Sequence, residues 1–166
     1  TDPNGNRTVM GYNERNWMTK ITDPSGAATR YEYDMEGHLI GITNAMGKSH
    51  TYVYDEMGQM ISETDVLGNK TCYEYNELGK CICRTDPEMR QTVYEYAKGG
   101  DLSRIIYPDG TSEAYLYDNN GNLIRRQNHK GDFLEITYDC VNQPIRVKSS
   151  FGQEKSYTYN AAGKVT

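Results

Sequence analysis

Carboxylates recur in one local context of this sequence, directly after a tyrosine, and are the first candidates for catalytic chemistry. Each of four aspartates stands directly after a tyrosine: Asp34, Asp55, Asp118 and Asp139. Paired carboxylates can act as general acids and bases. Catalysis requires one site that differs from its surroundings, whereas this placement is uniform. The regular spacing therefore indicates carboxylates that bond the backbone of a turn, and we predict that the chain is not an enzyme and has no catalytic residue.

One segment bears a partial likeness to a calcium-binding loop. The stretch DNNGN, from Asp118 to Asn122, is rich in oxygen ligands. It departs from the D-x-[DN]-x-[DN]-G spacing and has no closing glutamate. Since the same turn chemistry recurs elsewhere without such ligands, we predict no metal ion and no cofactor.

Thiols and imidazoles offer two further routes to chemistry. The four cysteines are Cys72, Cys81, Cys83 and Cys140, and no CxxC pair is present, which disfavours zinc. They are predicted to be small apolar fillers, with the second and third on one strand face and the first on the opposite face. The histidines, His38, His50 and His129, share no register and have no Ser or Cys partner at the spacing of a nucleophilic triad.

The elements that would position these groups follow a period of 21 residues. Each repeat has two ring-bearing positions separated by one residue. The second position holds Tyr12, Tyr33, Tyr54, Tyr75, Tyr96, Tyr117, Tyr138 and Tyr159. The first position holds tyrosine in six repeats: Tyr31, Tyr52, Tyr73, Tyr94, Tyr115 and Tyr157. We predict that these fourteen tyrosines are structural repeat positions.

A glycine follows four residues after the second tyrosine in most repeats. The column holds Gly37, Gly58, Gly79, Gly100, Gly121 and Gly163, with Asn16 and Asn142 in the remaining two places. Asparagine is the residue that next best tolerates positive φ, so the pattern indicates a backbone requirement. About ten residues later a second turn follows, of the Asp-Pro-x-Gly kind, at residues 2–5 and 23–26 among others.

Segments of strand length and β-prone composition separate the turns, for example residues 27–33 and 38–43. The sequence therefore predicts an all-β fold: an antiparallel β-hairpin repeat array that forms a long, twisted and curled sheet. A type I turn with a G1 bulge would place Tyr33 opposite Leu39. The next column, which includes Ile40, is expected to point to the other face. The departures at residues 97–100 and 139–142 are expected to mark altered turns or a change of curvature.

The composition limits which classes of protein the chain can belong to. The chain has 166 residues, 36% of them hydrophobic, a mean hydropathy of −0.83 and a net charge of −5. No basic cluster favours nucleic acid, and no apolar run could span a membrane. We expect a single array over residues 1–166, about eight repeats, cut from a longer one. Its two open edges should then favour edge-to-edge association.

The repeat resembles the YD repeats of the Rhs family. The segments YEYDMEGHLIGITNAMG and YLYDNNGNLIRRQNHKG carry the resemblance, which extends over the chain in eight registered copies. The family includes bacterial Rhs and wall-associated proteins, Tc toxin shell components and animal teneurins. The resemblance implies a strip of a hollow β-shell that encloses a C-terminal toxic polypeptide, on a secreted or cell-surface protein whose export signal would lie upstream. The DPxGLxGG-type self-cleavage motif of such shells is absent from these residues.

A second interpretation concerns the tyrosines themselves. Exposed tyrosine rings beside Asn, Asp and Gln form the kind of surface on which pyranose rings stack. The alternative function is therefore a module that binds carbohydrate or another cell-surface partner through a tyrosine-rich face. The two interpretations differ in whether packing between hairpins covers the rings.

Overall fold

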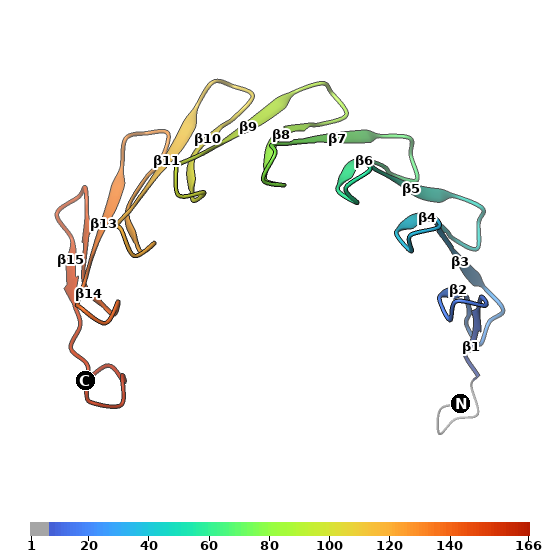
Figure 1. Ribbon diagram of the computed structural model, residues 1–166, viewed down its shortest axis with the longest axis horizontal. Helices are drawn as coiled ribbons and strands as arrows, with labels where there is room; N and C mark the ends of the chain where they lie inside the picture. Colours follow the sequence, from blue (N-terminus) through green and yellow to red (C-terminus); the bar gives the residue numbers. More distant parts are fainter. Residues whose placement is uncertain (1–6) are drawn as a thin grey trace. The chain divides into compact units, whose positions relative to one another are not determined.

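The computed structural model describes residues 7–166, so the predicted turn at residues 2–5 lies outside the described residues. Fifteen antiparallel strands follow one another in chain order (Figure 1). This confirms the predicted all-β hairpin array. Over residues 7–166, no helix has the length and apolar character needed to cross a membrane.

The chain divides into two compact units, Thr1–Arg90 and Gln91–Thr166. The first unit contains β1 (Val9–Tyr12), β2 (Met18–Thr22), β3 (Ala28–Tyr33), β4 (Leu39–Thr43), β5 (Ser49–Tyr54), β6 (Met60–Thr64), β7 (Lys70–Tyr75) and β8 (Cys81–Thr85). The second unit contains β9 (Gln91–Tyr96), β10 (Leu102–Ile106), β11 (Ser112–Tyr117), β12 (Leu123–Gln127), β13 (Phe133–Tyr138), β14 (Pro144–Ser149) and β15 (Glu154–Ser156).

Both kinds of turn close in the same way. In the turn after β5, the Asp55 amide donates to the Gln59 carbonyl over 2.9 Å, and the Gly58 amide donates to the Asp55 carbonyl over 3.0 Å. The turn after β4 repeats this pattern at 44–48, again with the glycine at positive φ. These are the bonds of a type I turn with a G1 bulge, as the sequence predicted. The segments 97–101 and 139–143, whose sequences depart from the repeat pattern, make the same bonds, so the expectation of altered turns there was wrong.

Every hairpin that begins with a tyrosine strand has a second bulge. Tyr54 lies opposite Met60 as predicted, but Val53 lies opposite Ser62, so Ile61 is an extra residue in β6. The same shift recurs in the hairpins β1–β2, β3–β4, β7–β8, β9–β10, β11–β12 and β13–β14. The pairs across the second turn, such as β6–β7, show no shift.

The second bulge follows from the odd length of the repeat. Successive residues of a strand alternate between faces, and residues paired across two strands lie on the same face. With regular pairing across both turns of a 21-residue repeat, the tyrosines of neighbouring repeats would therefore lie on opposite faces. One extra residue per unit restores the parity. Tyr52 then pairs with Glu63, which pairs with Thr71, so Tyr73 lies on the same face as Tyr52.

The bulge also corrects a prediction about the cysteines. Cys81 pairs with Tyr75, but Cys83 pairs with Glu74, on the other face of the sheet. Cys72 shares that face with Glu74, because both belong to β7 and are two residues apart. The prediction that Cys81 and Cys83 lie on one face was therefore wrong. The bulge residue Ile40 likewise has no partner in the strand register, so simple alternation does not assign its face.

The sheet has no conventional hydrophobic core. Among the described residues, the buried side chains are Cys83, Ser62 and Thr71. The tyrosines of the two columns are half-buried, except Tyr12, which is exposed. Cohesion must therefore come from contacts between neighbouring hairpins, as in other repeat proteins.

Candidate functional surface: the tyrosine face and the turn rim

The hydroxyl groups of the second tyrosine column join consecutive hairpins. Five of these hydroxyl groups donate to the backbone carbonyl of the residue fifteen positions earlier, which begins the return strand of the preceding hairpin. The donors and acceptors are Tyr33 and Met18 (3.0 Å), Tyr54 and Leu39 (3.0 Å), Tyr75 and Met60 (2.8 Å), Tyr138 and Leu123 (3.1 Å), and Tyr159 and Pro144 (2.7 Å). We call this contact the tyrosine clamp.

The clamp replaces backbone pairing that the sheet does not make. The register of β6 with β7 runs only from Thr64–Lys70 to Ser62–Cys72. Met60, two residues before Ser62, has no backbone partner in that register, and its carbonyl accepts the Tyr75 hydroxyl instead. A half-buried carbonyl without a partner is costly, so the hydroxyl supplies a bond that the local backbone cannot. Sequence reasoning missed this role, because tyrosine and phenylalanine are equally suited to packing.

The glycine column has positive φ, as predicted, and at two positions it also meets a neighbouring ring. The φ angles of Gly37 and Gly58 are 99° and 75°. A Cβ at Gly37 would lie 2.7 Å from Cζ2 of Trp17, and one at Gly58 would lie 2.8 Å from Nε2 of His38. The two rings also lie close to the next tyrosines: Trp17 is 5.4 Å from Tyr33, and His38 is stacked 4.8 Å from Tyr54.

The remaining predicted repeat positions lie where the register requires. Positive φ also occurs at Gly79, Gly100, Gly121, Gly163, Asn16 and Asn142. Further half-buried tyrosines of the two columns are Tyr31, Tyr52, Tyr73, Tyr94, Tyr96, Tyr115, Tyr117 and Tyr157. Within each unit, the structure therefore brings the tyrosines into columns on one face and places the glycines in the turns.

The recurring aspartates bond the turns, as the sequence indicated. Oδ1 of Asp118 accepts the amides of Asn120 and Asn122, both over 2.9 Å, and its Oδ2 accepts the Asn122 side chain. The bond from the Asn122 side chain, followed by that from its amide, holds the pKa of Asp118 below its ordinary value. Asp55 and Asp139 accept the corresponding amides in their own turns. At least one oxygen atom of each of these carboxylates is therefore bonded within its own turn.

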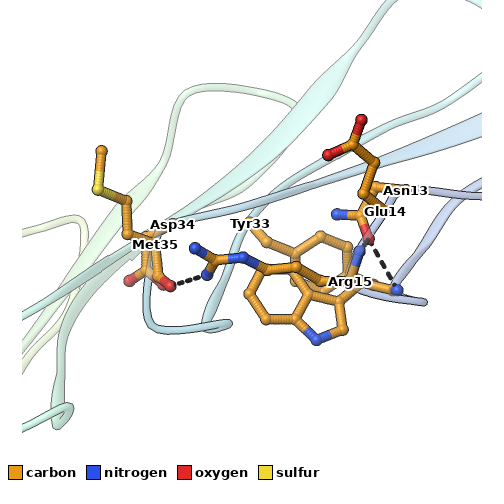
Figure 2. Close-up of a pocket in the computed structure, with 7 residues that line it drawn as sticks. Asn13, Glu14, Arg15, Tyr33, Asp34 and Met35 are labelled. Carbon is orange, nitrogen blue, oxygen red and sulfur yellow. Dashed lines mark hydrogen bonds between the residues drawn. The ribbon is translucent and has the colours of Figure 1, made fainter.

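A hollow of about 430 Å³ lies on the rim beside Trp17, the single tryptophan of the chain (Figure 2). Figure 2 shows Arg15 reaching across the hollow toward Met35, whose carbonyl accepts its guanidinium. The Arg15 guanidinium also lies 5.2 Å from the centre of the Trp17 ring. Residues lining the hollow are Asn13, Glu14, Arg15, Trp17, Tyr33, Asp34 and Met35.

In the second unit, Glu113 and Arg126 form a charged cluster with Tyr115. Glu113 accepts the Tyr115 hydroxyl over 2.8 Å and two bonds from Arg126, at 2.9 and 3.2 Å. These bonds, that from Tyr115 first, lower the pKa of Glu113. Burial, followed by the bond to Glu113, raises the pKa of Tyr115 to about 12.

We expect this cluster to produce a loss of stability at alkaline pH. The folded chain favours the neutral phenol of Tyr115, whose pKa in the unfolded chain is about 10. The cluster's stabilisation is therefore complete below pH of about 10 and is lost as the pH rises toward the folded value of about 12. Tyrosinate absorbance should show the difference between wild type and Tyr115→Phe titrating near the upper value. A difference that titrates near 10 would contradict the assignment.

Taken together, the geometry defines a class of protein: an open array of β-hairpins held together by side-chain contacts between repeats. The RHS repeat family model matches residues 1–28, 12–45 and 33–70, and the teneurin YD-shell family model matches residues 83–166. The second match covers half of the chain, and the chain belongs to this YD-shell family. No curated protein matches the sequence.

Solved structures with the same fold come from Tc toxins. In the Photorhabdus luminescens Tc holotoxin pore with mutant TccC3, the matching chain is 17% identical, with a TM-score of 0.79, over 96% of this chain and 10% of that one. In the TcdB2–TccC3–Cdc42 complex, the matching chain is 16% identical, with a TM-score of 0.79, and the match covers 97% of this chain and 10% of that one. At this identity the likeness shows the fold alone, and the chain spans about one tenth of the length of these proteins.

Proposed function

We propose that the chain is a non-catalytic section of the wall of a YD-repeat shell, which encapsulates a C-terminal toxin polypeptide and helps to deliver it. The tyrosine clamp is the observation that carries this proposal. It uses the hydroxyl groups to hold one hairpin to the next, and the rings are half-buried in the same contacts. Membership of the YD-shell family and the fold shared with Tc toxin chains support the same role.

The partners in this function are the rest of the repeat shell and the polypeptide that it encloses. β1 and β15 are the first and last strands of the order, and the β1 side chains Val9, Met10 and Tyr12 are about half exposed. We expect these edges to pair with further repeats, or with each other in the isolated chain. The proposal places the protein outside the cell or at its surface and includes no nucleic-acid partner, in keeping with a net charge of −5.

The test uses the full reading frame that contains this chain. Opening the wall with Tyr54→Ala and Tyr75→Ala should make the polypeptide encoded after the repeats sensitive to protease, whereas wild type and the exposed-site control Tyr12→Ala should protect it. Mass spectrometry of timed digests measures the protection. Equal cleavage of that polypeptide in wild type and the double variant would reject encapsulation.

A second candidate function is carbohydrate binding, and the Trp17 hollow is the observation that favours it. An indole and a phenol at 5.4 Å, beside the polar groups of Asn13 and Asp34, offer a stacking surface with hydrogen-bonding groups at its edge. Glycan titration followed by Trp17 fluorescence tests it. A saturable change that Arg15→Ala weakens and Tyr94→Ala leaves unaltered would favour this function over a purely structural wall.

A further inference from the structure

One turn on the rim differs from its neighbours in the donor groups that it presents. Asp34, Glu36 and His38 lie at alternate positions of a single turn, and one ligand atom from each lies within 4.8 Å of the other two. The next turn has Asp55, Met57 and Gln59 in the same places, so the complete set is not required by the turn. Two carboxylates and an imidazole are ligands that borderline divalent cations accept.

The imidazole is held in a defined orientation. The His38 ring is stacked on Tyr54 with centroids 4.8 Å apart and planes 23° apart, and its edge abuts Gly58. Its Nδ1 atom faces Oδ2 of Asp34 at 2.8 Å. Oδ1 of Asp34 accepts the amides of Gly37 and His38, which fixes the carboxylate as well. Two of the three donors are therefore preorganised, and Glu36 is an exposed side chain free to adjust.

The surroundings add negative charge. The turn borders a hollow of about 690 Å³ whose lining also includes Asp55 and Glu56, and none of the residues that line it is a lysine or arginine. Asp55 is committed to its own turn through the amides of Met57 and Gln59. Its charge nevertheless contributes to a field that favours a cation. The Arg15 guanidinium bonds the Met35 carbonyl of the same turn and is a competing cation.

We propose that this turn binds a divalent transition-metal ion of the zinc type through Asp34, Glu36 and His38, with water completing the coordination. The ion would lie between His38 Nδ1 and Asp34 Oδ2, in place of the hydrogen bond that joins them. This inference goes beyond the shell function and does not depend on it. Its role would be to fix the rim of the second hairpin.

Trp17 provides an internal reporter for the test. Its ring lies against the same turn, 2.7 Å from the Cβ position at Gly37, and it is the single tryptophan of the chain. The experiment uses the 166-residue chain with Cys140→Ser, which removes an exposed thiol that could itself bind metal. Ni²⁺ should quench Trp17 fluorescence saturably, and Zn²⁺ should compete with it and give one site by calorimetry.

Two histidine variants separate this site from other binding. His38→Gln reproduces the neighbouring turn, in which the Gln59 side chain donates to Oδ2 of Asp55 over 3.0 Å, so the variant should fold. We expect His38→Gln to weaken Zn²⁺ binding on the order of 10-fold or more. His50→Gln, which alters a histidine facing the single carboxylate of Glu63, should leave it unchanged. Equal affinities of the two variants, or no saturable binding in the Cys140→Ser chain, would overturn the proposal.

Discussion

Gly37→Ala is expected to destabilise the chain far more than Gly47→Ala, although both replace a turn glycine of positive φ. The φ angles are 99° and 77°, so both variants incur the left-handed backbone cost, roughly 1–2 kcal/mol. Only at Gly37 does the new methyl group also meet a ring, 2.7 Å from Trp17 Cζ2, whereas nothing lies within 4 Å at Gly47. Overpacking adds roughly 1–3 kcal/mol. The expected loss is therefore about 2–5 kcal/mol at Gly37.

Urea unfolding of the two variants measures this difference. A double-mutant cycle sharpens it: in a Trp17→Ala background the steric part should vanish, so that Gly37→Ala there costs about as much as Gly47→Ala. Should the two single variants lose the same free energy of unfolding, the close approach of Trp17 has no energetic weight and backbone conformation alone explains the glycine column.

Tyr54→Phe tests the clamp by removing one oxygen atom. The Leu39 carbonyl, which accepts the Tyr54 hydroxyl over 3.0 Å, loses its partner. Leaving a half-buried acceptor unsatisfied costs about 1–3 kcal/mol, with the lower end favoured because water can reach part of the site. Tyr54→Ala also removes the ring that is stacked on His38 and faces Met60, and its total cost should be about 2–4 kcal/mol.

Tyr12→Phe is the matched control for the clamp. Tyr12 occupies the same column but is 53% exposed, and its hydroxyl donates to the Met10 sulfur over 3.4 Å rather than to a backbone carbonyl of residues 7–166. The free energy of unfolding should change by no more than about 0.5 kcal/mol. Amide exchange offers a local measurement, because loss of the clamp should speed exchange at the junction of β4 with β5. If Tyr54→Phe and Tyr12→Phe are equally stable, the hydroxyl is dispensable.

Much of this fold follows from local residue chemistry. The tyrosine and glycine columns predicted the strands, the type I turns and the pairing of Tyr33 with Leu39, because each depends on residues within one hairpin. The second bulge could also have been predicted from the sequence, since a repeat of odd length cannot keep its tyrosines on one face without it. Missing it assigned Cys83 to the wrong face.

The contacts between hairpins were harder to predict. The bond from Tyr75 to the Met60 carbonyl depends on where the backbone pairing of β6 with β7 ends, and no residue type indicates that point. The donor set at Asp34, Glu36 and His38 was visible as separate residues. Its convergence depends on the turn, which folds alternate positions toward one another, and on Tyr54, which holds the imidazole.

The fifteen-residue span of the clamp constrains how such a chain can change in length. Deleting a single residue from a return strand would exchange the two faces of the later strands relative to the earlier ones and move the next tyrosine hydroxyl away from its carbonyl. Duplicating or deleting one complete 21-residue unit leaves every remaining hydroxyl opposite a carbonyl of the same kind. Genes for this architecture should therefore grow and shrink by whole modules, and indels of other sizes should be found only in the loops at the rims.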